Sequence, residues 1–101
     1  MLLSVNAAPM SRSDNSLSEA IAPRLVAVRE ARGYKTTLAA SKASGVGNST
    51  LARYEAAQRC PSVECLLKLS RTYDVPLDFL CAGITGCVDP DLLAKLDLKQ
   101  G

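Results

Sequence analysis

Apolar positions recur at helical spacing along most of the chain, and no alternating pattern typical of a strand reaches a useful length. The first clear stripe consists of Ile21, Leu25 and Val28, which fall at i, i+4 and i+7. This spacing predicts an amphipathic helix that ends near Arg32, because Gly33 is the residue type that most often follows a helix end. The chain is therefore predicted to be all-α.

The start of this first helix can be placed in two ways. Ser16 and Glu19 have the spacing of a capping box, which favours an early start. Pro23 fits the first turn of a helix better than its interior, which favours a main helix that opens near Pro23 after a short helical turn. Residues 1–16 are rich in Ser, Asn, Asp and Pro with little periodicity, and they are predicted to form a flexible arm.

A second, short helix is predicted after Thr36, whose side chain can cap it, and it runs through about Ala43. Its apolar or small residues are Leu38, Ala39, Ala40 and Ala43. Residues 44–47, Ser-Gly-Val-Gly, then interrupt the helical pattern. Gly45 suits a sharp turn that needs positive φ, and Val46 suits a side chain that fills the core beneath the turn. Ala40 and Ala43 are small, which lets two helices cross closely.

Three further helices follow this turn. They are predicted over Asn48 to about Gln58, from the Ser62 cap to about Tyr73, and over Leu77 to about Ala82. Their expected buried residues are Leu51 and Tyr54, then Val63, Leu66, Leu67 and Leu69, and finally Leu77, Phe79 and Leu80. Asp74 is expected to close the fourth helix. A helix, a turn and a helix within residues 36–55 are the parts of a helix-turn-helix.

The tail, residues 85–101, carries one more helical signal. Asp89 would be an N-cap and Pro90 the first helical residue. Leu92, Leu93 and Leu96 could share one face, either packed within the chain, which we favour, or at a dimer seam. The predicted organisation is an arm (1–16), a helical domain (17–84) and a short extension (85–101).

Length and composition fit one small globular domain. The 101 residues are 48% hydrophobic, 22% charged and 4% aromatic, so the core is expected to consist of Leu, Val, Ala and Ile. A domain of this size is marginally stable alone, and a dimer partner would add stability.

Positive charge is concentrated in one stretch. From Gly33 to Cys60 there are four basic residues and one acidic residue, a net charge of +3. The rest of the chain has eight basic and nine acidic residues, a net charge of −1. The four bases are Lys35, Lys42, Arg53 and Arg59, and the acid is Glu55. A local basic surface suits a polyanion, although a solvated positive face explains the charge alone equally well.

Several function classes are excluded by residue content. The chain has no His, which removes His-based triads and HExxH metal sites, and it has no Gly-rich phosphate loop. The four cysteines form no CxxC pair, and residues 1–10 carry no basic residue as a signal peptide would. We therefore expect reduced thiols, no metal, no cofactor, no membrane span, no enzymatic activity and a cytoplasmic location.

Fragments from Ile21 to Gly83 occur in an order and spacing that is more specific than any fragment alone. They are Arg24-Leu25, Val28-Arg29, Arg32-Gly33, residues 43–46, residues 49–55, Pro61-Ser62-Val63, residues 66–69 and residues 75–80. In these fragments the chain resembles the lambda-repressor-like family, also called the Cro or XRE type. The resemblance implies a five-helix domain whose third helix enters the DNA major groove.

The resemblance also implies site residues. Those expected to contact base edges are Asn48, Ser49, Ala52 and Arg53. Asn suits adenine, Arg suits guanine and Ala suits a thymine methyl. Those expected to contact phosphates are Thr36, Thr37, Lys42, Thr50 and Arg59. Arg29 and Glu55 match an ion pair that joins the first and third helices of family members, although Arg29 could instead reach a phosphate.

This chain departs from the family pattern at four places. One extra residue lies between Gly33 and the cap of the second helix, at Tyr34-Lys35. Thr37 replaces a longer Gln that grips phosphate, so helix amides are expected to assist there. Gly47 replaces a Ser or Thr cap, which removes a side-chain hydrogen bond. Ala57 replaces a Gly after the third helix, so that helix is expected to run longer, because Ala disfavours positive φ.

The function implied is sequence-specific binding of double-stranded DNA by a homodimer at a palindromic operator. The resemblance points to a transcriptional repressor of the phage or plasmid type, located at the nucleoid. Two alternatives stay open: an antitoxin that represses its own operon and binds a toxin through the arm or the tail, and a protein-interaction module that has lost DNA binding.

Overall fold

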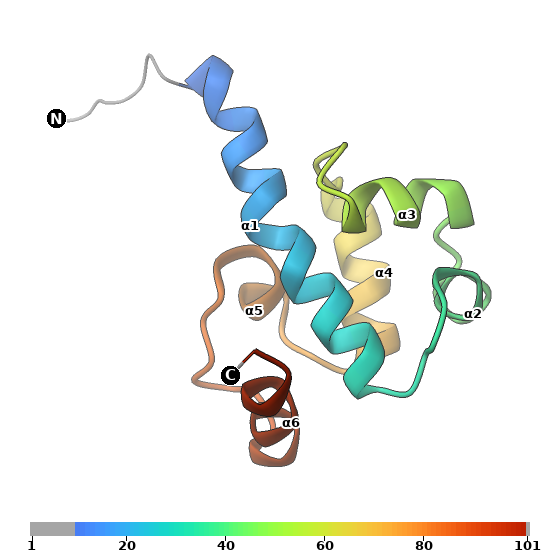
Figure 1. Cartoon of the computed structure of the whole chain (residues 1–101), viewed down its shortest axis with the longest axis vertical. Helices are drawn as coiled ribbons and strands as arrows, with labels where there is room; N and C mark the ends of the chain where they lie inside the picture. Colours follow the sequence, from blue (N-terminus) through green and yellow to red (C-terminus); the bar gives the residue numbers. More distant parts are fainter. Residues whose placement is uncertain (1–9, 101) are drawn as a thin grey trace, which may run out of the picture.

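The computed structural model describes the backbone of residues 10–100 and the side chains of residues 17–96. Within this range the chain is helical and contains no strand. The elements are α1 (Met10–Ala31), α2 (Thr37–Ser44), α3 (Asn48–Glu55), α4 (Val63–Tyr73), α5 (Leu77–Ala82) and α6 (Pro90–Gln100), coloured along the chain in Figure 1. The all-α prediction is confirmed.

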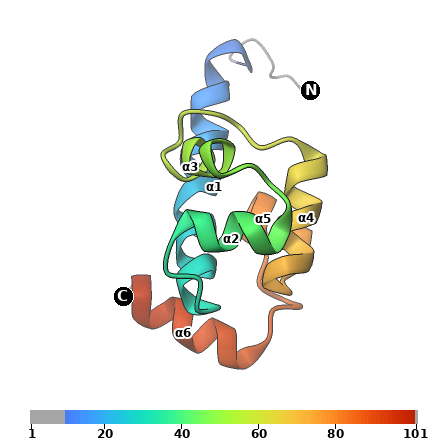
Figure 2. The same cartoon turned by 90° about the vertical axis from the view of Figure 1, so that its right-hand side faces the viewer.

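The long helix α1 is the centre of the bundle. It packs against α3 in one direction and against α5 and α6 in the other, while α2 packs on α3 and α4, and α4 on α5. Figure 1 shows α2 and α3 on one side of α1, with α5 and α6 toward the other. Figure 2 shows α2 and α3 as neighbouring helices, and in both views the first turns of α1 extend beyond the other helices.

The core draws on every helix. The predicted stripe on α1 is fully buried, since Leu25 and Val28 are 0% exposed and Ile21 is 2% exposed. The largest other side chains buried to the same degree are Leu51, Leu69, Tyr73, Leu80 and Leu92. Because Leu92 belongs to the extension, the core does not break at residue 84. The division into residues 17–84 and 85–101 stays a prediction.

The first helix begins earlier than expected. It is continuous from Met10 with Pro23 inside, so neither a helix start at Ser16 nor one at Pro23 is correct, and residues 10–16 of the predicted arm are helical. Residues 1–9 of that arm lie outside the described residues. Pro23 removes one helical hydrogen bond, but Ile21 and Ala22, just before it, are buried against the rest of the core. That burial offsets the cost of an interior Pro.

The caps predicted at Thr36, Ser62 and Asp89 are present. Thr36 Oγ1 accepts a hydrogen bond from the Ala39 amide at 3.1 Å, and Ser62 Oγ accepts one from the Cys65 amide at 3.1 Å. Asp89 Oδ1 accepts one from the Asp91 amide at 3.4 Å, directly before Pro90 opens α6. These caps depend on residues within three positions of one another, which is why they could be read from the sequence.

The extension packs within the chain, as favoured. Leu92 is 1% exposed and Leu96 is 3% exposed, and Leu93 lies half-buried against the core. The helix that carries them, α6, packs on α1. Leu92 and Leu96 are therefore part of the core of the single chain, and a dimer contact of the extension stays a prediction.

Some apolar residues expected inside the core lie outside it. Val63 is 67% exposed and Leu67 is 38% exposed, whereas Leu66 and Leu69 on the same helix are buried. Apolar residues occupy two neighbouring stripes of α4, and only the stripe of Leu66, Leu69 and Tyr73 faces the core. Ala43 is also exposed, so the close approach of α2 depends on Ala40, which is 0% exposed.

The third helix is shorter than expected. It ends at Glu55, and Ala57 adopts the left-handed conformation with φ of 61°. The Gln58 amide donates to the Arg53 carbonyl at 2.9 Å and the Ala57 amide to the Tyr54 carbonyl at 3.2 Å, which is a Schellman end. The expectation of a longer helix was wrong because these hydrogen bonds and the following chain outweigh the steric cost of an Ala at positive φ.

Replacing Ala57 by Gly is expected to stabilise the domain. Gly removes the Cβ clash of the left-handed conformation but adds freedom to the unfolded chain, so the expected net gain is about 1 kcal/mol. The neighbouring Ala56, with φ of −90°, is a matched control, and Ala56→Gly is expected to cost about 0.5–1 kcal/mol. Urea unfolding followed by circular dichroism measures both. A loss of stability in Ala57→Gly would contradict the prediction.

Candidate nucleic-acid interface

The turn between α2 and α3 is fixed by hydrogen bonds and one buried side chain. Gly45 ends α2 with φ of 87°, as predicted for a sharp turn. Ser41 Oγ donates to the Val46 carbonyl at 2.6 Å, and the Val46 amide donates to Ser44 Oγ at 3.2 Å. Val46 is 2% exposed, which confirms its predicted role as a plug. This turn sets the angle at which α3 is presented.

The outer face of α3 carries all four residues predicted to contact bases. Asn48, Ser49, Ala52 and Arg53 are each exposed and fall at i, i+1, i+4 and i+5, so they share one side of the helix. Leu51 and Tyr54 lie on the opposite side, 0% and 3% exposed, and are core residues as expected. The helix is thus anchored by one face and leaves the other open to a ligand.

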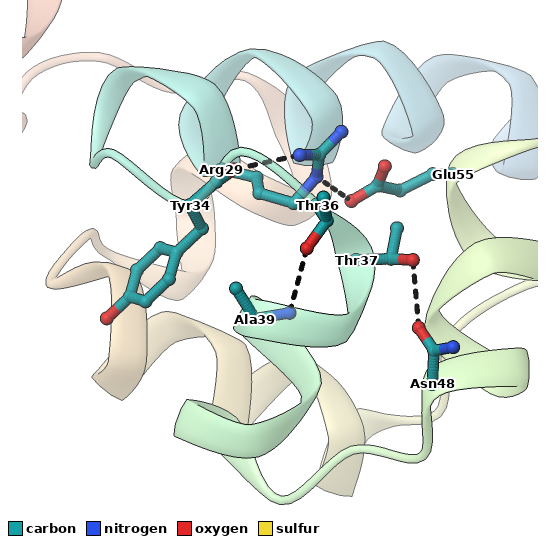
Figure 3. A network of polar contacts seen from close by, with 7 residues as sticks. All are labelled: Arg29, Tyr34, Thr36, Thr37, Ala39, Asn48 and Glu55. Carbon is teal, nitrogen blue, oxygen red and sulfur yellow. Dashed lines mark hydrogen bonds and ion pairs between the residues drawn. The ribbon is translucent and has the colours of Figure 1, made fainter.

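The residues predicted to contact phosphates lie around this face. Thr36, Lys42 and Arg59 are exposed, and Thr37 and Thr50 are half-buried. Thr36 and Thr37 stand at the start of α2, Lys42 near its end, and Arg59 in the segment after α3. One predicted phosphate-contacting residue is hydrogen-bonded to a predicted base-contacting residue. Thr37 Oγ1 donates to Asn48 Oδ1 at 2.8 Å (Figure 3). Their roles toward DNA stay predictions.

The expected ion pair between α1 and α3 is present. Arg29 Nε lies 2.8 Å from Glu55 Oε2, and the two side chains are only 9% and 8% exposed. Arg29 Nη1 also donates to the Tyr34 carbonyl at 2.8 Å, so the guanidinium lies between two acceptors (Figure 3). This arrangement favours a structural role for Arg29 over contact with a phosphate, and its role toward DNA stays a prediction.

Pairing of Glu55 changes the charge that this region presents. Glu55 is the only acid between Gly33 and Cys60, and it is neutralised by a buried arginine from outside that stretch. Lys35, Lys42, Arg53 and Arg59 are all exposed, and among the side chains that the structure describes none of them joins an ion pair. The exposed surface of α2, α3 and their flanking segments is therefore more cationic than the sequence count indicates.

Two further arginines, Arg24 in α1 and Arg32 directly after it, donate to carbonyl groups at helix ends, which the sequence reasoning missed. Arg24 Nη1 donates to the carbonyls of Leu80 and Cys81 at 3.3 and 3.2 Å, at the end of α5. Arg32 donates to the carbonyls of Tyr73 and Asp74 at 2.7 and 3.0 Å, at the end of α4. The sequence did contain an indication of these contacts. Arginines lie between and just after the buried residues of the first helix, and from there their long side chains can reach the ends of neighbouring helices.

Cys65 lies in the first turn of α4, beside two hydroxyl groups. Hydrogen bonds from the hydroxyls of Ser62 and Tyr54 lower the pKa of the Cys65 thiol. Burial raises the pKa of the Tyr54 phenol, and its contact with the Cys65 thiol raises it further. Burial raises the pKa of the Cys81 thiol on α5. Two half-buried thiols therefore differ in acidity because of their neighbours.

Cys65 is expected to be alkylated at lower pH than Cys81 in the folded protein. The thiolate is the nucleophile, and its population rises at lower pH for the thiol with the lower pKa. Brief iodoacetamide pulses between pH 6 and 9, followed by mass spectrometry of the peptides, give the pH profile of each site. In urea the two profiles should coincide. Earlier alkylation of Cys81 in the folded state would contradict the assignment.

Neither metal coordination nor a membrane span is found in the described part of the chain. Across the described residues, no three His, Cys, Asp or Glu side chains gather closely enough to hold a metal ion. No helix found there combines the length and the apolar character needed to cross a bilayer.

A short helix, a glycine turn and a second helix with one open face, held on a helical bundle, define a helix-turn-helix domain. The HTH_3 family, described as Helix-turn-helix, matches residues 25–80. The chain therefore belongs to this helix-turn-helix family, of the Cro/XRE type. The family expected from the sequence fragments is confirmed.

One curated relative is similar over part of the chain. The chain is 42% identical over 57 residues to the HTH-type transcriptional regulator ImmR of Bacillus subtilis (strain 168). This match covers 56% of the chain and 44% of the relative, so the chain spans less than half of the relative's length. No solved structure matches the chain.

Proposed function

We propose that this protein binds double-stranded DNA sequence-specifically and regulates transcription, as a repressor of the phage or plasmid type. The observation that carries the proposal is the outer face of α3, where Asn48, Ser49, Ala52 and Arg53 are exposed together on a helix anchored by its other face. Amide and guanidinium groups at such positions read base edges in the major groove. The exposed basic side chains around this face attract the phosphates of DNA.

The proposal includes a homodimer at a palindromic operator. Two copies would place their α3 helices in successive major grooves, about one helical turn of DNA apart. Exposed apolar side chains offer area that a second copy could cover. The large ones among the described residues are Leu17, Leu38, Val63, Leu67 and Ile84. We assign no enzymatic step to the chain, and the proposed location is the cytoplasm, at the nucleoid.

The antitoxin alternative has weaker support from the structure. It calls for an arm or a tail that stays free until a toxin binds, whereas α6 packs on α1 through Leu92 and Leu96. The tail route is therefore not part of the proposal. A protein partner elsewhere on the surface, or a module without DNA binding, would show in the experiment below.

The proposal is tested by selection from a randomised duplex pool, with sequencing of the bound fraction. An enriched palindrome with two half-sites is the expected result. Binding that falls steeply with salt but enriches no sequence would indicate contact with the DNA backbone only. Absence of binding at moderate salt would overturn the proposal in favour of a protein-interaction module.

A further inference from the structure

One polar atom inside the core has no hydrogen-bond partner. Tyr73 is the last residue of α4 and is 0% exposed, and among the described residues its hydroxyl is the only buried side-chain oxygen or nitrogen without a protein partner. A hydroxyl can donate one hydrogen bond and accept others, and burying it without any partner costs stability. The Tyr73 hydroxyl therefore calls for a polar partner beyond the protein groups that surround it.

The charged groups nearest to this hydroxyl are those of the ion pair between α1 and α3. Burial raises the pKa of the Tyr73 phenol, and the negative charge of the Glu55 carboxylate raises it further, against the opposing charge of Arg29. The Tyr73 ring also packs on the Tyr34 ring, with centroids 5.8 Å apart, and the Tyr34 carbonyl accepts from Arg29 (Figure 3). The hydroxyl therefore keeps its hydrogen and can donate it on the side of the ion pair.

The ion pair has hydrogen-bonding capacity beyond its direct contacts. Arg29 Nε lies 2.8 Å from Glu55 Oε2, and the other carboxylate oxygen, Oε1, takes no part in this contact. Arg29 Nη1 donates to the Tyr34 carbonyl, and Nη2 takes part in neither contact. Both side chains are less than a tenth exposed, so bulk solvent reaches them poorly. Buried polar groups of this kind are commonly bridged by a single ordered water.

We propose that one buried water molecule links the Tyr73 hydroxyl to the Arg29–Glu55 pair. The water accepts from the Tyr73 hydroxyl and donates to the Glu55 carboxylate, and the Arg29 guanidinium is its third partner. A buried water needs about two to four polar partners, which these groups supply. Arg29, Glu55 and Tyr73 belong to the last turns of α1, α3 and α4, so the water connects three helix ends. This site does not depend on DNA binding.

The first test is a high-resolution crystal structure of the unaltered protein. The expected result is density for a water within hydrogen-bonding distance of both Tyr73 Oη and a carboxylate oxygen of Glu55. In crystals of Tyr73→Phe this density should be lost, because one partner of the water is removed. Absence of the water from the unaltered protein, or a direct hydrogen bond from Tyr73 to Glu55, would overturn the proposal.

Unfolding in urea, followed by circular dichroism, measures what the bridged hydroxyl contributes. Tyr73→Phe is expected to lower the equilibrium constant for folding by about fivefold, which is the net effect of one hydrogen bond. Tyr34→Phe is the matched control, because the Tyr34 hydroxyl of the same ring pair points away from Arg29 (Figure 3). It should change the constant by less than about twofold. An unchanged or higher constant in Tyr73→Phe would mean that the hydroxyl is unbridged, against the proposal.

A thermodynamic cycle assigns the effect to the ion pair. In a background of Arg29→Met with Glu55→Met, Tyr73→Phe should no longer lower the folding constant, because the other partners of the water are absent. The same loss of about fivefold in that background would mean that the hydroxyl is satisfied elsewhere, and the proposal would be wrong. The crystal structures decide the matter independently if that background unfolds too readily to measure.

Discussion

Replacing Arg29 by Met is expected to lower the free energy of unfolding by about 3–5 kcal/mol. The substitution leaves Glu55 as an uncompensated charge in a site where both side chains are less than a tenth exposed. It also removes the donor to the Tyr34 carbonyl. Because small domains are stable by only about 5–15 kcal/mol, a loss of this size is a large fraction of the total. Urea unfolding followed by circular dichroism measures it.

A double variant separates the charge from the packing. Replacing both partners, as in Arg29→Met with Glu55→Met, removes the orphaned charge and is expected to recover much of the lost stability. Recovery should be incomplete, since the Tyr34 carbonyl still lacks its donor. If the single variant is too unstable to measure, Glu55→Gln keeps the shape and gives a milder loss. A single variant within about 1 kcal/mol of the unaltered protein would show that the pair is not structural.

Replacing Arg53 by Ala is expected to weaken operator binding by about 10- to 100-fold without changing the melting temperature. One bidentate contact to a base discriminates by about 1–3 kcal/mol, which sets this range. Arg53 is exposed, and among the described side chains it joins no ion pair, so the fold does not depend on it. The affinity is measured by fluorescence anisotropy with a labelled operator and with a scrambled duplex.

Two control variants identify the origin of that loss. Arg71→Ala removes the same charge from the last turn of α4, where Arg71 is exposed. This variant should bind the operator with nearly unchanged affinity. Lys42→Ala should weaken binding to operator and scrambled DNA alike and reduce the salt slope by about 1. If Arg53→Ala also weakened both duplexes equally, Arg53 would contact the backbone and not a base.

Local signals in the sequence predicted most of the fold. The caps at Thr36, Ser62 and Asp89 and the positive φ of Gly45 depend on a few neighbouring residues, and all are found in the structure. Features that depend on residues distant in the sequence were harder to predict. The start of α1 was misplaced because Pro23 argued locally against a helix whose interior is stabilised by burial of Ile21.

Sequence reasoning also could not choose between faces or fix side-chain directions. Two apolar stripes on α4 are equally good by spacing, and only packing shows that Val63 and Leu67 face outward. The exposed face of α3 could be predicted, because Leu51 and Tyr54 were expected to be buried. The hydrogen bond between Thr37 and Asn48 could not, because it joins side chains 11 residues apart on two helices, and their directions depend on how the helices pack.

Three arginines in and just after α1 hold the ends of two other helices and the segment that follows α1. Arg24 holds the end of α5, Arg32 the end of α4, and Arg29 the segment that follows α1. Terminal turns usually fray independently and exchange their amide hydrogens fastest. Here the last turns of α4 and α5 cannot open without releasing these donors. Their amides should therefore exchange with deuterium at rates close to those of the α1 centre, as one cooperative unit.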